Sequence, residues 1–211
     1  MKKQKNITYI RFKTNISNTL PNLVDNERIY SILIISTCSY HLHLERAMPI
    51  FTYHHPLFGK VTYKTAHEEK VFGDRIIFTK GLNEKDIQYV TIPELKNIKN
   101  VSSTFLFHVK GHEQLKLAFS EIHSAGLIHI IKELGAPYYA RLRKPTSGIY
   151  SSKPSNHAFG IALDINPNDG GNGISSSPLS NIFIKHGFTW GNTFTAKDPM
   201  HYEINEFIFQ N

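Results

Sequence analysis

The sequence predicts an α+β domain built around a small antiparallel sheet with flanking helices. Three short segments rich in Val, Ile, Tyr, Phe and Thr come first, each bounded by Gly, Asn or Pro, as is typical of strands. A longer segment with apolar residues at helical spacing follows, and strand-like segments return in the last third of the chain. Strands, then a helix, then further strands indicate an α+β arrangement.

The elements are expected in a definite order along the chain. They are strands at 58–64, 74–80 and 87–95, a helix at 112–134, a loop at 144–155, a turn into a strand at 157–166, a long loop at 167–178, a short helix at 178–187 and a closing strand at 201–209. Gly135 and Pro137 end the long helix. Gly126 lies inside it, so two shorter helices are the alternative.

Length and composition predict a folded chain of one domain, with or without a small appendage. The chain has 211 residues, of which 40% are hydrophobic, enough to bury a core and to exclude wholesale disorder. We divide it into an N-terminal segment of unassigned role, 1–56, and a functional domain, 57–211. The longest apolar run, 29–38, is too short to span a bilayer and starts late for a signal peptide. We expect no transmembrane segment and interpret the run as a buried strand or helix, with a degenerate export signal as the alternative.

Charge is distributed unevenly along the chain. The net charge is +7, but residues 156–211 hold two Lys against five Asp or Glu, so this part carries −3 and the rest +10. A basic surface favours anionic partners such as nucleic acid, anionic lipid or acidic wall polymer. No base-reading motif is present, so we expect no nucleic-acid partner. The single cysteine, Cys38, excludes an intrachain disulfide and a Cys-rich zinc site.

Two segments carry a pattern suited to metal chemistry, SNHAFGIALDIN at 155–166 and DPMHYE at 198–203. His157, Asp164 and His201 offer two imidazoles and one carboxylate, which leaves the fourth position of a tetrahedral zinc ion open. Gly160 permits a tight bend between His157 and Asp164, which on a straight strand would lie on opposite faces about 23 Å apart. The alternative is that these are packing or turn histidines and a loop-capping carboxylate.

Asp198 is placed to act as a general base. It lies three residues before His201, and Pro199 argues against an ordinary helix between them. An extended or turned segment can direct His201 to the metal and Asp198 to the open position beside it, where a general base is needed.

Together these motifs, S-x-H-x-x-G-x-A-x-D and D-x-x-H-aromatic-E, resemble those of the zinc D-Ala-D-Ala carboxypeptidase family, which includes VanY-like carboxypeptidases and phage L-alanyl-D-glutamate endopeptidases. Segments at 57–64, 90–95, 117–127, 138–141 and 186–191, together with His108, look similar too, so the resemblance spans about 57–206. It implies a hedgehog/DD-peptidase-like zinc fold and a Zn2+-dependent metallopeptidase that hydrolyses peptide bonds in peptidoglycan stem peptides.

The resemblance also implies roles for individual residues. It assigns zinc to His157, Asp164 and His201, the catalytic base to Asp198, oxyanion stabilisation to Arg141 and substrate orientation to Ser155. Arg143 competes with Arg141, which we prefer because the aromatic pair and Ala140 before it match the family. The family often has a short Arg-Gly-Ser stretch where this chain has KPTSGIYSSKPS at 144–155, and this departure leaves the substrate preference open.

Other candidates have weaker patterns. His41, His43, His54 and His55 lack a nearby set of further ligands, which favours surface or packing roles. Trp190 is expected to be a core or site-wall aromatic rather than a substrate stacker, and Cys38 a buried small side chain. Glu203 either orients the imidazole of His201 or is a structural edge-strand carboxylate.

For the whole protein we expect stem peptides and anionic wall polymers as partners, a monomeric state, and action on the cell wall in the periplasm or outside the cell. The export route and the bond that is cut stay open. The alternative function is a non-catalytic, zinc-containing wall-binding or signalling domain.

Overall fold

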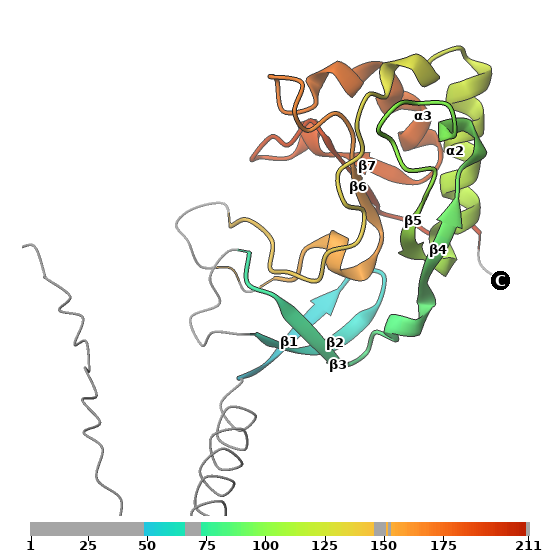
Figure 1. Ribbon diagram of the computed structural model, residues 1–211. Coiled ribbons are helices and arrows are strands. Elements are labelled where there is room, and N and C mark those ends of the chain that lie inside the picture. Colours follow the sequence, from blue (N-terminus) through green and yellow to red (C-terminus); the bar gives the residue numbers. More distant parts are fainter. Residues whose placement is uncertain (1–48, 66–72, 146–150, 152, 210–211) are drawn as a thin grey trace, which may run out of the picture. The chain divides into compact units, whose positions relative to one another are not determined.

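The computed structural model describes residues 49–65, 73–145, 151 and 153–209 (Figure 1). The predictions for the run 29–38, including Cys38, and for His41 and His43 fall outside these residues, as does part of the loop 144–155. Within the described part, short antiparallel sheets combine with two α-helices, which confirms an α+β architecture. None of the helices in this part is long and apolar enough to cross a membrane.

In the part of the chain that the structure describes, three small antiparallel sheets replace the single sheet that the sequence predicted. The first holds β1 (Ile50–His55), β2 (Gly59–Thr65) and β3 (Ile76–Lys80) in that order. The second pairs β4 (Ile87–Thr91) with β5 (Thr104–His108), and the third has the order β6 (Ala162–Asp164), β8 (His201–Ile204), β7 (Phe188–Trp190). Because β1 pairs with β2, residues 50–55 share a sheet with the start of the predicted functional domain, and the functional division at residue 57 stays a prediction.

The long helix is shorter than predicted. Helix α2 (His112–Ser124) buries Leu115, Phe119 and Ile122 on one face and ends ten residues before 134. Gly126 has a φ of 73°, a left-handed conformation that terminates the helix, and a 3-10 turn, η4 (Ile128–Ile130), follows. The break at Gly126, which the sequence offered as the alternative, is therefore the one observed.

Other boundaries also differ from the sequence pattern. The short helix begins as a 3-10 segment, η6 (Ile174–Leu179), and continues as α3 (Ser180–Lys185). The closing strand stops at Ile204 instead of 209, because the next two backbone N–H groups donate to the carbonyl of Gly187 and turn the chain. Strands β1, β5 and β7 were not predicted; β7 has only three residues, too few for a visible alternation.

The third sheet rests on a packed aromatic core beneath α2 and α3. Phe183 of α3 lies at its centre, with ring centroids 5.7 Å from Phe119, 5.3 Å from Phe188 and 4.6 Å from Tyr202. All four side chains are buried. The middle strand, β8, is thereby held on both edges by β6 and β7 and on one face by the core, which makes it a rigid base for functional side chains.

Candidate metal centre

The motif at 155–166 folds into a helical turn, a bend and a strand. Ser155 Oγ accepts a hydrogen bond from the backbone N–H of His157 at 3.3 Å and so caps the 3-10 helix η5 (Asn156–Phe159). Gly160 ends this helix with a φ of 65°, and the chain then enters β6. The bend predicted at Gly160 is confirmed, and it brings His157 to the same side as Asp164.

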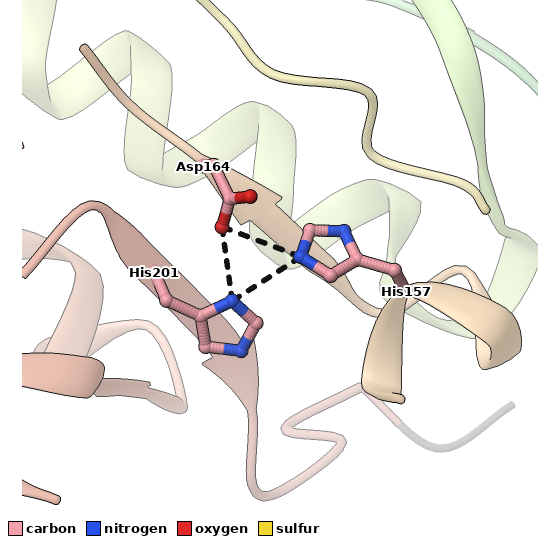
Figure 2. Close-up of side chains that lie close together, drawn as sticks. All are labelled: His157, Asp164 and His201. Atoms are coloured by element: carbon pink, nitrogen blue, oxygen red, sulfur yellow. Dashed lines mark hydrogen bonds and ion pairs between the residues drawn. The ribbon is translucent and has the colours of Figure 1, made fainter. Parts of the chain in front are cut away.

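Strand pairing supplies the third side chain. Asp164 is the last residue of β6 and lies directly opposite His201, the first residue of β8. Figure 2 shows His157, Asp164 and His201 pointing toward one another from the helical turn and the two strands. One potential ligand atom of each lies within 4.8 Å of the others. The structure therefore brings together the three residues that the sequence predicted as ligands.

The spacing of the three atoms matches a zinc shell. His201 Nδ1 lies 3.0 Å from Asp164 Oδ1 and 3.2 Å from His157 Nε2, and His157 Nε2 lies 3.3 Å from Asp164 Oδ1. Two ligand atoms bound to a tetrahedral zinc at ordinary bond lengths are about 3.3 Å apart. These residues fit Zn2+ in type, number and separation.

The outer nitrogens of both imidazoles are occupied by acceptors. His157 Nδ1 donates to the carbonyl of Pro137 at 3.3 Å, and His201 Nε2 donates to Glu203 Oε2 at 2.9 Å. In the neutral rings, His157 Nε2 and His201 Nδ1 then carry lone pairs directed at Asp164. Three electron-rich atoms thus face one another, an arrangement that requires a cation or a proton between them.

The pKa values of His201 and Asp164 also indicate that the site requires a positive charge. Burial lowers the pKa of His201, but its hydrogen bonds to Asp164 and Glu203 raise it by more, to about 9. Burial raises the pKa of Asp164, and its hydrogen bonds to His157 and His201 outweigh this and hold the pKa well below the usual range. The site therefore favours an anionic carboxylate next to a bound positive charge.

The cluster lies in an open pocket with a volume of about 710 Å³, within the ordinary range for ligand sites. The predicted residues that line it are His157, Asp164, His201, Asp198, Arg141, Arg143 and Ser155. Every site residue predicted from the sequence thus borders one pocket.

Asp198 is held in the pocket by a fixed turn. Its Oδ1 accepts a hydrogen bond from Asn172 Nδ2 at 3.0 Å, and its backbone carbonyl accepts from the N–H of His201 at 3.0 Å. Trp190 Nε1 donates to the carbonyl of Pro199 at 2.7 Å and stacks against Tyr202. Trp190 therefore has the packing role expected of it and braces the turn between Asp198 and His201.

Both candidate arginines face the pocket. Backbone hydrogen bonds and a bridge pair 141–143 with 153–155, so the segment is extended. Side chains alternate in such a segment: Leu142 is fully buried, while Arg141 and Arg143 line the pocket. Arg141 Nη1 also donates to the carbonyl of Leu142 at 3.2 Å. The geometry admits either arginine.

The sequence pattern assigned no role at the metal cluster to two residues that lie near it, His55 and Asn156. His55 is buried, whereas its neighbour His54 is exposed, and His55 Nε2 donates to Asn156 Oδ1 at 2.9 Å. Asn156 lies inside the motif, between Ser155 and His157, and this position was the only available signal. Glu203, for which two roles were open, accepts from His201 and so has the geometry of the orienting residue.

Comparison with known proteins supports the resemblance over part of the chain. No curated protein and no solved structure matches it. Residues 150–204, which include the three clustered residues, Asp198 and Glu203, match the family model described as D-alanyl-D-alanine carboxypeptidase. Arg141 and Arg143 lie outside the matched segment. The chain is thus similar, over its site-bearing segment, to a family of peptidases that act on peptidoglycan.

Proposed function

We propose that this protein is a zinc-dependent peptidase that hydrolyses peptide bonds in peptidoglycan stem peptides, as a D,D-carboxypeptidase or an L-Ala-D-Glu endopeptidase, on a hedgehog/DD-peptidase-like fold. The observation that carries the proposal is the cluster of His157, Asp164 and His201 in an open pocket. Its atoms are separated by distances that suit zinc, and it lies inside the segment that matches the carboxypeptidase family.

The residues around the cluster supply the remaining chemistry. Zinc held there would activate a water molecule and polarise the scissile carbonyl. Asn172 orients the carboxylate of Asp198 through Oδ1, and we assign to Oδ2 the proton that passes from the attacking water to the leaving amine. The guanidinium of Arg141 would donate to the oxygen on which negative charge develops.

The pocket also suits an anionic peptide. Arg141, Arg143, Lys144 and Lys197 line it, while two of its three carboxylates, Asp164 and Glu203, already lie within hydrogen-bond distance of histidine nitrogens. Stem peptides carry several carboxylates, which such a surface attracts. We propose that the protein meets them as a monomer in the wall, in the periplasm or outside the cell.

The first prediction tests the activity and the base together. Zinc-loaded wild type should release peptide fragments from purified peptidoglycan, identified by mass spectrometry, and the fragment masses report which bond is cut. Asp198→Asn should hold zinc in the same ratio but turn over roughly 10²-fold more slowly or worse, because the amide cannot accept the proton.

Two outcomes would contradict this proposal at different points. Turnover of Asp198→Asn near that of wild type would mean that another group is the base. A wild type that binds zinc and cleaves no stem peptide would favour a zinc-containing wall-binding or signalling domain instead.

A further inference from the structure

A buried histidine on the first strand connects to the metal cluster through two side chains. His55 ends β1, far from the motif in sequence, and its side chain packs against Phe159 of η5 with a ring-centroid distance of 4.2 Å. Its Nδ1 accepts from the backbone N–H of Leu57 at 3.0 Å, and its Nε2 lies 2.9 Å from Asn156 Oδ1. Burial lowers the pKa of His55, which favours the neutral ring.

These contacts fix the tautomer of His55 and the orientation of the next side chain. Because the Leu57 N–H occupies Nδ1, the proton of the neutral ring is on Nε2 and is donated to Asn156 Oδ1. The amide of Asn156 is thereby oriented with its oxygen toward His55. Burial raises the pKa of Glu203, and an interaction with the Asn156 side chain, whose free donor is the amide nitrogen, is among the effects that lower it. A reversed amide would lose the hydrogen bond from His55.

The chain of contacts ends on a candidate ligand. Glu203 Oε2 accepts from His201 Nε2 at 2.9 Å, and this contact leaves Nδ1 of His201 facing His157 and Asp164. His55 is buried and Asn156 and Glu203 are partly buried, so their contacts are less screened than those at the open surface. Outer hydrogen bonds of this kind set the ring orientation and basicity of metal-bound histidines.

We propose that His55 is a positioning residue for the metal centre, acting through Asn156 and Glu203 on the ring of His201. The proposal rests on the proposed zinc site and gives the end of the N-terminal segment a part in it. A purely structural alternative is that His55 only caps the turn after β1, where the Leu57 N–H is its partner. The two differ in whether zinc affinity depends on the His55–Asn156 hydrogen bond.

The test measures zinc affinity and the visible spectrum of the cobalt-substituted full chain for wild type, four single variants and one double variant. His55→Phe keeps an aromatic ring against Phe159 but loses both nitrogens, and we expect zinc affinity to fall about tenfold and the cobalt bands to shift. His55→Gln retains an N–H donor and should recover most of the affinity. His54→Ala, on the exposed neighbour, should match wild type.

The fourth variant, Asn156→Ala, should weaken zinc binding at least as much as His55→Phe does. Combining both changes should cost no more than Asn156→Ala alone, because His55 acts through Asn156. Thermal unfolding of the metal-free proteins separates this effect from a loss of fold, and if His55→Phe does not fold, Asn156→Ala decides.

Unchanged zinc affinity in folded His55→Phe or in Asn156→Ala would overturn the inference. So would a double variant in which the losses of zinc-binding free energy from the two substitutions simply add. A wild type that binds no zinc would overturn the proposed function and this inference with it, whereas zinc binding that ignores His55 would overturn only the latter.

Discussion

At the scale of single residues, the pocket presents two arginines where the chemistry needs one. Arg141 and Arg143 lie on the same side of an extended segment, two positions apart, and both line the pocket. Arg143 is close enough to Glu203 to help lower the pKa of that carboxyl, although burial of Glu203 acts in the opposite direction and is the largest contribution. Glu203 bonds to His201, so Arg143 acts electrostatically beside the cluster. We keep the oxyanion role for Arg141 on the resemblance of the aromatic pair and Ala140 before it to the family.

Separate alanine substitutions should distinguish the two arginines. Arg141→Ala should lower kcat/KM for a stem peptide. The expected loss of transition-state stabilisation is about 3 kcal/mol, the usual cost of losing one oxyanion donor. Arg143→Ala, the matched control, should cost far less, and both should keep their zinc. The measurement is hydrolysis rate alongside metal content. If Arg143→Ala instead shows the large loss of activity, the oxyanion role belongs to Arg143, and the proposed zinc chemistry is unaffected.

At the scale of elements, the turn from Asp198 to His201 packs against the end of β7. The N–H of Asp198 donates to the carbonyl of Gly191 at 3.0 Å. A Cβ atom on Gly191 would lie 2.3 Å from the carbonyl oxygen of Asp198 and 3.0 Å from Cβ of His201. The first distance is shorter than real Cβ contacts reach and the second is tighter than most of them, so glycine is what lets the two segments approach this closely.

Gly191→Ala should therefore disturb base and ligand together. The turn must shift, and we expect zinc affinity and turnover each to fall by about tenfold or more. Small misplacements of groups at a reacting centre lower the rate by at least this factor. Gly170→Ala is the control: its φ of 82° makes substitution strained, but its Cβ would meet nothing within 4 Å. It should lower the unfolding temperature without changing zinc affinity, measured by competition with a chelating dye. Equal zinc binding in Gly191→Ala and wild type would contradict the role given to this contact.

At the scale of the whole molecule, charge is separated along the chain. Residues 156–211, which hold the proposed ligands and the base, carry −3, whereas residues 1–155 carry +10. The positive charge thus lies mainly in residues 1–155, whereas the proposed ligands and base lie in residues 156–211. This separation favours electrostatic attachment to anionic wall polymers by the first three quarters of the chain.

Retention on purified sacculi should consequently decrease as salt rises. Exposed charges are screened beyond about 8 Å at physiological ionic strength, and further salt shortens that distance. Pull-down at low and high salt measures the effect, and the Asp198→Asn variant allows binding to be followed without digestion. Retention that does not change with salt would show that the attachment is not electrostatic.

The amino-acid sequence was sufficient wherever the information is local. The start of α2, its alternative end at Gly126 and the bend at Gly160 depend on side-chain periodicity and on the few residues that tolerate a positive φ. The candidate ligands were recognisable because the chemistry demands particular residue types at short spacings, in SNHAFGIALD and DPMH. That they bind zinc stays a prediction.

Other features depended on contacts between distant parts of the chain. The pairing of Asp164 with His201 is set by the register of β6 and β8, and the pairing of His55 with Asn156 joins residues 101 positions apart. Which nitrogen of each imidazole faces the cluster follows from Pro137 and Glu203. No spacing rule relates such positions, because their separation is decided by how strands and helices pack against a common core. For the same reason the division of the described residues into three sheets, instead of one, was visible only in the folded chain.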